Sequence, residues 1–273
     1  MLYLERIPSA PLAGFVSRLW YARAPGPDHH RQRILPTGRV QVILNLENNH
    51  LHDCPDGEPD RPVSPALVVG ARSVYELVST RDMADLIGVV FEPGGFACFV
   101  TEPVDLFTNR SVDLEAVWGA SARGLRERLL EERDPLSRLC CLDQFLLARF
   151  AVRRPLSTRA GALALTLARL RHSPSLATVR EMARGTGLSE RRFSQIFREQ
   201  VGFSPKAWCR IQRFQRAVRI IHSGADVRWA ELSLDCGFYD QAHFANEFRA
   251  FSGVDATTYS SLRTQWANHI SVE

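Results

Sequence analysis

The residues best placed to do chemistry share one face of a helix expected from the segment "GLSERRFSQIFREQVGFSPK", residues 187–206. Four polar side chains recur there at positions i, i+3, i+4 and i+7, which form one stripe of an α-helix. They are Arg191, Ser194, Gln195 and Arg198. Arginine can bind guanine O6 and N7, and glutamine can bind adenine N6 and N7, so the stripe is suited to base edges in duplex DNA. The alternative is a solvated surface.

The opposite face of this segment is apolar. Phe193, Ile196 and Phe197 follow the spacing i, i+3, i+4 of a buried helix face. Ser189 is a suitable N-cap, and Gly202 is a suitable residue to end the helix. We therefore expect the arginines to point away from the core.

The sequence contains this pattern twice. The segments "VREMARGTGLSERRFSQIFREQVGFSPKAW" and "WAELSLDCGFYDQAHFANEFRAFSGVDATTY" share a small residue four positions before a glycine, then two aromatic residues, then a second glycine. A small residue, a tight glycine turn and a capped helix with an aromatic core are typical of a helix-turn-helix. Two such units in tandem, joined by the helical segment "SPKAWCRIQRFQRAVRIIHSG", favour DNA reading over a solvated surface.

In the second unit Asp240 is the expected N-cap, and Phe244, Phe248 and Phe251 form the core face. The outward face consists of Gln241, Ala242, Ala245, Asn246 and Arg249. Asn246 can bind adenine with two hydrogen bonds, whereas an alanine can only touch a thymine methyl group. We expect this helix to make fewer base-specific contacts than the first.

Charge and composition agree with a nucleic-acid partner. The chain has 273 residues and a net charge of +4, and residues 170–273 carry the whole excess, with 14 basic against 10 acidic residues. This asymmetry favours a polyanion as partner. None of the six cysteines forms a C-x-x-C pair, and we expect neither a signal segment nor a stretch that spans a bilayer. We expect reduced thiols, a cytoplasmic protein and no membrane partner.

The first hundred residues contain β-branched runs, and helical periodicity follows from about residue 113. The runs are "RVQVILNL", "PALVVG" and "DLIGVVFEPGG", and residues 48–65 are expected to form a surface loop. We predict an α+β chain, with a strand-rich N-terminal domain, following helices and an all-α C-terminal double helix-turn-helix domain. The expected regions are 1–155 for regulation or dimerisation, 156–174 for a connecting helix and linker, and 175–262 for DNA binding.

These motifs resemble the AraC/XylS family of bacterial transcription regulators. The segments "GLSERRFSQIFREQVGFSPKAW", "RFQRAVRII" and "CGFYDQAHFANEFRAFSG" carry the resemblance over about residues 175–260. It implies that the two recognition helices enter successive major grooves on one DNA face, and that RNA polymerase is a partner. It implies base-facing roles for Arg191, Ser194 and Gln195 in the first unit and for Gln241, Ala242, Ala245 and Asn246 in the second. The family's usual Ser-Pro-x-x-Tyr is "DATTY" here, so the last helix is expected to start differently.

The N-terminal segments "ILPTGRVQVILNL", "LVVGARSVYELV" and "IGVVFEPGGF" resemble, more loosely, the sensor domain of such regulators. This resemblance implies a cupin-like barrel followed by helices. We expect Trp20, Tyr21 and the strands around residues 40–46 and 86–91 to line or support the barrel, where a small-molecule effector would enter. A homodimer is a further expectation.

Two alternatives for the N-terminal domain stay open. A metal-dependent cupin-type enzyme would use His50, His52 and Asp56 of "HLHDCPD", but these residues lie in the expected loop. There is no Ser/His/Asp arrangement, P-loop or G-x-G-x-x-G, so we expect no catalytic residue, no metal and no cofactor. A purely protein-interaction domain would instead pair subunits through the leucine stripes of residues 113–151.

Overall fold

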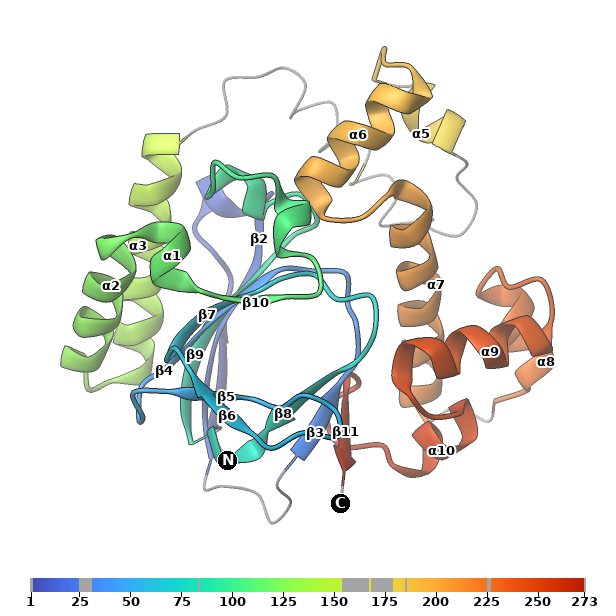
Figure 1. Ribbon diagram of the computed structural model, residues 1–273, viewed down its shortest axis with the longest axis horizontal. Coiled ribbons are helices and arrows are strands. Elements are labelled where there is room, and N and C mark those ends of the chain that lie inside the picture. The colour runs from blue at the N-terminus through green and yellow to red at the C-terminus, as the bar shows by residue number, and fades with distance from the viewer. Residues whose placement is uncertain are drawn as a thin grey trace.

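The computed structural model describes residues 2–24, 31–82, 84–153, 167, 179–184, 186–224 and 227–272. Figure 1 shows two sheets in the N-terminal part, with helices α1, α2 and α3 on one side and the C-terminal helices on the other. This arrangement confirms the predicted class, a strand-rich N-terminal region with helices after it and a helical C-terminal region.

The larger sheet has six antiparallel strands in the order β1-β2-β9-β4-β7-β10. The strands are β1 (Leu2–Arg6), β2 (Val16–Arg23), β9 (Asp85–Phe91), β4 (Gln41–Asn45), β7 (Ala66–Val69) and β10 (Ser111–Asp113). Successive side chains point to opposite faces of a strand. Leu19 and Tyr21 on one face are fully buried, whereas Trp20 between them is half-buried. The two faces of this sheet therefore have different neighbours.

The buried face of this sheet packs against helices. The helices are α1 (Leu114–Trp118), α2 (Ala120–Glu131) and α3 (Pro135–Arg153). Arg138 of α3 donates to the hydroxyl of Tyr21 at 3.4 Å and to Asp85 at 3.0 Å. Tyr21 thus supports the sheet from the helix side, while Trp20 lies on the other face. There it covers Gly88, where a Cβ atom would come within 2.6 Å of the indole, so a side chain would displace Trp20.

The second sheet has five antiparallel strands in the order β11-β3-β8-β5-β6. The strands are β11 (His269–Val272), β3 (Arg31–Ile34), β8 (Glu76–Ser79), β5 (Leu51–Asp53) and β6 (Arg61–Val63). The prediction of a loop over residues 48–65 is wrong in part, because β5 and β6 form a short hairpin inside it. Both strands are three residues long and β6 contains Pro62, so neither gives a strand signal in the sequence.

Four short 3₁₀ helices lie between the strands of the N-terminal part, and two of them contact a C-terminal helix. They are η1 (Ala10–Leu12), η2 (Thr80–Asp82), η3 (Phe96–Cys98) and η4 (Val104–Phe107). Both η3 and η4 contact the helix α6 described below. They bring the end of the N-terminal domain against the first helix-turn-helix unit.

The C-terminal region forms two helix-turn-helix units joined by a long helix. Its helices are α5 (Val179–Arg184), α6 (Glu190–Val201), α7 (Pro205–His222), α8 (Trp229–Asp235), α9 (Gln241–Ser252) and α10 (Ala256–Ser261). Aromatic contacts join the units to α7: Phe197 meets Trp208, and Phe248 meets Phe214, with ring centroids 6.0 and 5.2 Å apart. Asp255 caps α10 by accepting from the backbone N–H of Thr258, so an aspartate starts the last helix.

The predicted helix and linker over residues 156–174 lie outside the described residues, apart from Leu167. Leu167 is helical and buried. It lies beside Gly94, where an added Cβ would be 3.1 Å from its Cδ1 atom. This contact places one residue of the segment between the two regions of the chain.

Candidate nucleic-acid interface

Helix α6 is built as its sequence predicts. The Ser189 side chain accepts from the backbone N–H of Arg192, and Gly202 ends the helix in the left-handed region with φ 96°. Phe193, Ile196 and Phe197 are buried on the core face. The helix is thus held firmly at both ends and along one side, which leaves its other side for recognition.

The polar stripe of α6 faces solvent, as expected. Arg191, Gln195 and Arg198 are exposed, and Ser194 is half-buried. Among contacts of the described residues, Arg191 has no ion pair, so its guanidinium is available to a ligand. Arg198 differs, because its Nε donates to Asp105 of η4 at 3.0 Å.

Gln195 is held by two neighbours that the sequence analysis did not single out. Arg192 donates to its carbonyl oxygen at 2.8 Å, and its amide nitrogen donates to Glu199 at 2.8 Å. These neighbours lie three and four positions away on the helix, so helical spacing is the signal that could have found them. The stripe itself lacks acidic residues, but an acidic residue borders it.

Helix α9 presents its predicted outward face in the same way. Asp240 caps it by accepting from the backbone N–H of His243 at 2.7 Å, and Gly253 ends it with φ 74°. The five predicted contact residues are all exposed; they are Gln241, Ala242, Ala245, Asn246 and Arg249. The aromatic residues of the core face are buried.

Helix α7 fixes the two units relative to one another. Arg210 of α7 donates two hydrogen bonds to the carboxylate of Glu247 on α9, at 2.8 and 2.5 Å. The Arg210 guanidinium holds the pKa of Glu247 below its usual value, mainly by hydrogen bonding. Arg210 also lies over the ring of Phe251, 5.6 Å from its centroid. These contacts of Arg210 hold α9 against α7, the helix that follows α6 in the chain.

The N-terminal domain contacts the C-terminal ends of both α6 and α9. Thr108, just after η4, donates to the backbone carbonyl of Gly202 at 2.7 Å, next to the Arg198–Asp105 pair. At the end of α9, the backbone N–H of Tyr75 donates to the carbonyl of Phe251 at 2.9 Å. A Cβ on Gly253 would come within 2.5 Å of the Tyr75 ring. Helices α6 and α9 therefore each have one end in contact with the N-terminal domain.

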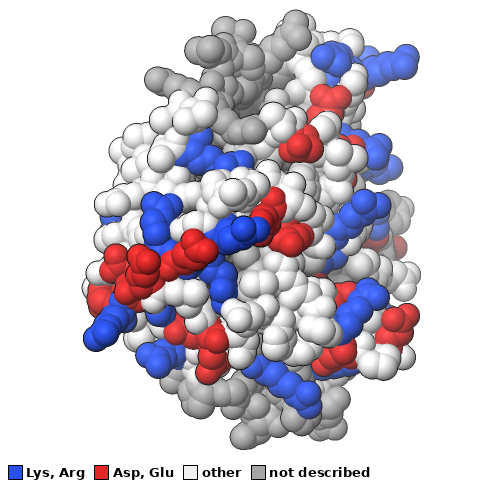
Figure 2. Space-filling model, turned by 60° about the vertical axis from the view of Figure 1, so that its left-hand side comes forward, with Lys and Arg blue, Asp and Glu red and all other residues white. Residues whose placement is uncertain are grey.

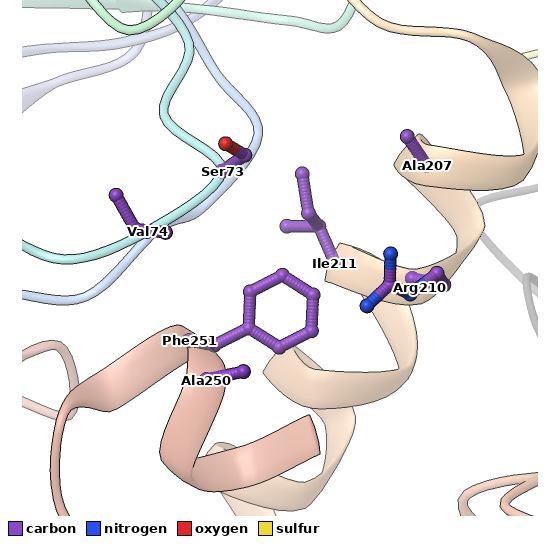
Figure 3. Close-up of a pocket in the computed structure, with 7 residues that line it drawn as sticks. All are labelled: Ser73, Val74, Ala207, Arg210, Ile211, Ala250 and Phe251. Atoms are coloured by element: carbon purple, nitrogen blue, oxygen red, sulfur yellow. The ribbon is translucent and has the colours of Figure 1, made fainter. Parts of the chain in front are cut away.

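A cavity of about 240 Å³ lies at this domain boundary. Figure 3 shows Ser73 and Val74 on one side, Ala207, Arg210 and Ile211 of α7 on another, and Ala250 and Phe251 of α9 below. The lining is mostly apolar, and the Arg210 guanidinium at its edge is already paired with Glu247. The cavity touches the N-terminal domain, the linker helix and the second unit at once.

The end of the chain returns to the N-terminal domain. Strand β11 pairs with β3 over four residues, with His269 opposite Ile34 and Val272 opposite Arg31. Gln215 of α7 donates both to the carbonyl of Pro36 at 2.9 Å and to Asn268 at 2.8 Å, next to this strand. The two regions thus share one sheet. In the sequence, β11 is only the short run "HISV", and no local feature predicts that it pairs with β3.

The face of the molecule that carries α1–α3 has charged side chains of both signs. Figure 2, turned so that the side of α1–α3 comes forward, shows basic and acidic groups interleaved. This mixture fits the balanced charge of the N-terminal part.

Within the described ranges, no group of three His, Cys, Asp or Glu residues is arranged to hold a metal ion. The rings of His50 and His52 instead lie edge to face, with their centroids 4.8 Å apart.

The tandem units define the class of protein: a DNA-binding transcription regulator. A family described as "Helix-turn-helix domain" matches residues 182–261, which span both units. This match supports the resemblance of the C-terminal region to AraC/XylS-type regulators. A family described as "Domain of unknown function (DUF6597)" matches residues 4–113. Comparison with curated proteins gives no significant match. In the part of the chain that is described, no helix is both long and apolar enough to cross a membrane.

Several solved structures are similar to the chain. The DNA-binding domain of AdpA, in complex with a target DNA, is 27% identical with a TM-score of 0.34, over 37% of this chain and 90% of that one. Fatty acid-bound ToxT from Vibrio cholerae is 8% identical with a TM-score of 0.47, over 99% of this chain and 98% of that one. A DNA-binding transcriptional dual regulator from Escherichia coli K-12 is 18% identical with a TM-score of 0.33, over 40% and 95%.

Proposed function

We propose that α6 and α9 read base sequence in successive major grooves of duplex DNA. The contact residues are Arg191, Ser194, Gln195 and Arg198 from α6, and Gln241, Ala242, Ala245, Asn246 and Arg249 from α9. The observation that carries the proposal is that eight of these nine residues are exposed on faces opposite two buried aromatic cores. Arginine, glutamine and asparagine are the side chains that discriminate bases by paired hydrogen bonds.

Selection of binding sites from a random duplex pool with the full-length protein tests this proposal. Affinity for the selected site should fall with salt, with a slope of about −0.9 in log K per phosphate neutralised. Gln195→Ala and Asn246→Ala should each lose about 1–3 kcal/mol on the selected site and little on a scrambled duplex, because base contacts carry the specific part of binding. Gln144→Ala, an exposed residue on α3, is the matched control. Equal losses on both duplexes would contradict the assignment.

We also propose that residues 1–155 regulate the DNA-binding domain at 175–262, through residues 156–174 and through direct contact. The contacts of Thr108 with Gly202 and of Tyr75 with Phe251 support this, because they touch the ends of both recognition helices. Any movement of η4 or of the Tyr75 segment would therefore change how α6 and α9 are held.

The regulation would respond to a small-molecule effector or to a second copy of the chain, bound to residues 1–155. Two places suit an effector: the half-buried face with Trp20, Ile43 and Leu67, and the boundary cavity beside Val74. A thermal-shift screen against a metabolite panel tests this. Ile43→Trp should block a ligand of the first place, and Val74→Trp a ligand of the second. Stabilisation by no compound would favour a purely dimerising domain.

Dimerisation would use the exposed leucines of α2 and α3. Leu130 and Leu136 are 41% and 58% exposed. A dimer in light scattering that Leu136→Glu converts to a monomer would support this surface, and a monomeric wild type would contradict it. As a regulator of this class the protein would act in the cytoplasm with RNA polymerase as partner, which transcription in vitro from a selected site tests.

A further inference from the structure

We propose that Arg192 and Glu199 are positioning residues that fix the side-chain amide of Gln195, and so decide which DNA strand must carry the adenine that Gln195 reads. The inference rests on the proposed function, because it requires α6 to face base edges. It gives roles to two residues outside the polar stripe.

Three side chains on α6 form a continuous chain of hydrogen bonds. Nη1 of Arg192 donates to Oε1 of Gln195, and Nε2 of Gln195 donates to Oε1 of Glu199, both at 2.8 Å. The spacings, i to i+3 and i to i+4, are those at which helical side chains meet. Arg192 and Glu199 are seven residues apart, about 10 Å along the axis. They are therefore bridged by the amide between them.

These two hydrogen bonds determine which end of the Gln195 amide points toward which end of α6. A guanidinium group only donates hydrogen bonds, and a carboxylate only accepts them. Turning the amide by half a rotation would set its NH₂ group against Arg192 and its oxygen against Glu199, so that two attractive contacts would become repulsive. The oxygen of Gln195 therefore points toward the N-terminal end of α6, and its nitrogen points toward the C-terminal end.

The amide of Gln195 keeps enough bonding capacity for a base. Its oxygen has a second lone pair, and its nitrogen has a second hydrogen. Adenine uses both in the major groove, because N6–H donates and N7 accepts. With the amide fixed, N6 has to lie toward the N-terminal end of α6 and N7 toward the C-terminal end. An A·T pair satisfies this in one of its two orientations, so the site distinguishes A·T from T·A.

The test measures binding of the full-length protein to duplexes that differ at one base pair. That pair is the position where Gln195→Ala loses discrimination, and each of the four base pairs is placed there. The wild type should prefer A·T over T·A by roughly five- to a hundredfold. Arg192→Ala with Glu199→Ala should bring this ratio close to one.

The sharpest variant exchanges the two charges. Arg192→Glu with Glu199→Arg keeps the net charge of α6 but favours the opposite amide orientation, so the preference should invert to T·A. Glu190→Ala is the matched control, since it removes another carboxylate of α6, one that pairs with Arg180 at 3.1 Å rather than with Gln195. It should leave the ratio unchanged.

The outcomes separate this inference from the function on which it rests. If Gln195→Ala alters discrimination at no position, base reading by Gln195 is wrong. If Gln195→Ala acts but the double alanine variant and the charge exchange keep the wild-type ratio, base reading stands and the positioning role is wrong. Melting temperatures are recorded for each variant, because a merely structural role would lower them without changing the ratio.

Discussion

Arg198 of the first recognition helix donates to Asp105 of the N-terminal domain across the boundary between the two regions, with Nε 3.0 Å from Oδ2. The arginine side chain is 66% exposed and the aspartate 22% exposed, so the pair lies at the rim of the contact. Arg198 is also on the stripe proposed to face DNA. Asp105 and DNA would therefore compete for the same guanidinium of Arg198.

Replacing Asp105 should strengthen DNA binding. Asp105→Asn removes the carboxylate that competes for Arg198, and exposed pairs of this kind contribute about 0.2–1 kcal/mol. We expect the affinity of the full-length protein for its selected site to rise by a corresponding factor, about 1.5 to 5, in fluorescence anisotropy. Glu127→Gln, which removes the same charge from α2, should change nothing. A weaker or unchanged affinity of Asp105→Asn would argue against competition.

Two substitutions on opposite faces of α6 should have opposite signatures. Phe197→Ala deletes a fully buried aromatic side chain, which costs about 3–5 kcal/mol of stability, so DNA binding should be lost through unfolding. Arg191→Ala changes an exposed side chain without an ion pair among the described contacts. It should keep the melting temperature while weakening binding to the selected site. A melting temperature of Arg191→Ala lowered as far as that of Phe197→Ala would place Arg191 in the core instead.

The pairing of β11 with β3 should weaken in mild acid. Burial lowers the pKa of His269 from 6.5 to about 4, because a charged ring would lose its hydration there; the ring Nδ1 lies 3.0 Å from Oε1 of Gln32. Once released, the ring regains its ordinary pKa and takes up a proton below pH 6.5. The stabilising contribution of neutral His269 is therefore fully present above pH 6.5. It falls as the pH drops toward 4, by up to about 1.4 kcal/mol per pH unit.

Amide hydrogen exchange, corrected for intrinsic rates, measures this effect. Protection of residues 31–34 of β3 should decrease between pH 7 and pH 5 in the wild type. His269→Gln cannot titrate, so its protection should be independent of pH over this range. Equal pH dependence in both proteins would show that another group is responsible.

Helix-turn-helix elements were predictable because their signals are local. Ser189 and Asp240 cap the helices as expected, and the buried aromatic faces follow from spacing within twelve residues. The strand-rich character of the N-terminal part also followed from β-branched runs. The predicted contact residues lie on the expected faces, although what they bind is a proposal.

Features that depend on distant parts of the chain were not predictable in this way. The pairing of β11 with β3 joins residues more than 230 positions apart, and the contact of Asp105 with Arg198 joins residues 93 positions apart. No local periodicity encodes such pairs. The hairpin of β5 and β6 was not predicted for a different reason. Its strands are too short and too polar for the alternation of apolar and polar residues that marks a strand.

The ion pair between Arg210 and Glu247 should stabilise the protein in a pH-dependent way. Arg210 holds the pKa of Glu247 below 4.5, so its contribution is complete above pH 4.5 and is lost as the pH falls through the lower value in the folded state. Hydrogen bonds to a charged group contribute about 1.5–3 kcal/mol each, less where the partner is exposed, as Arg210 is at 43%. Glu247→Gln should therefore lower the free energy of unfolding by about 1–3 kcal/mol at pH 7.

Urea unfolding of the wild type and of Glu247→Gln, compared from pH 7 to pH 3.5, checks this prediction. The difference between the two proteins should shrink below pH 4.5, because protonation removes from the wild type the charge that the variant already lacks. Glu231→Gln is the matched control: its carboxylate pairs with Arg228 at 2.7 Å on α8, where both side chains are more than half exposed. It should change stability by less than about 0.5 kcal/mol at every pH. A constant difference for Glu247→Gln across this range would mean that its shape, rather than its charge, joins α7 to α9.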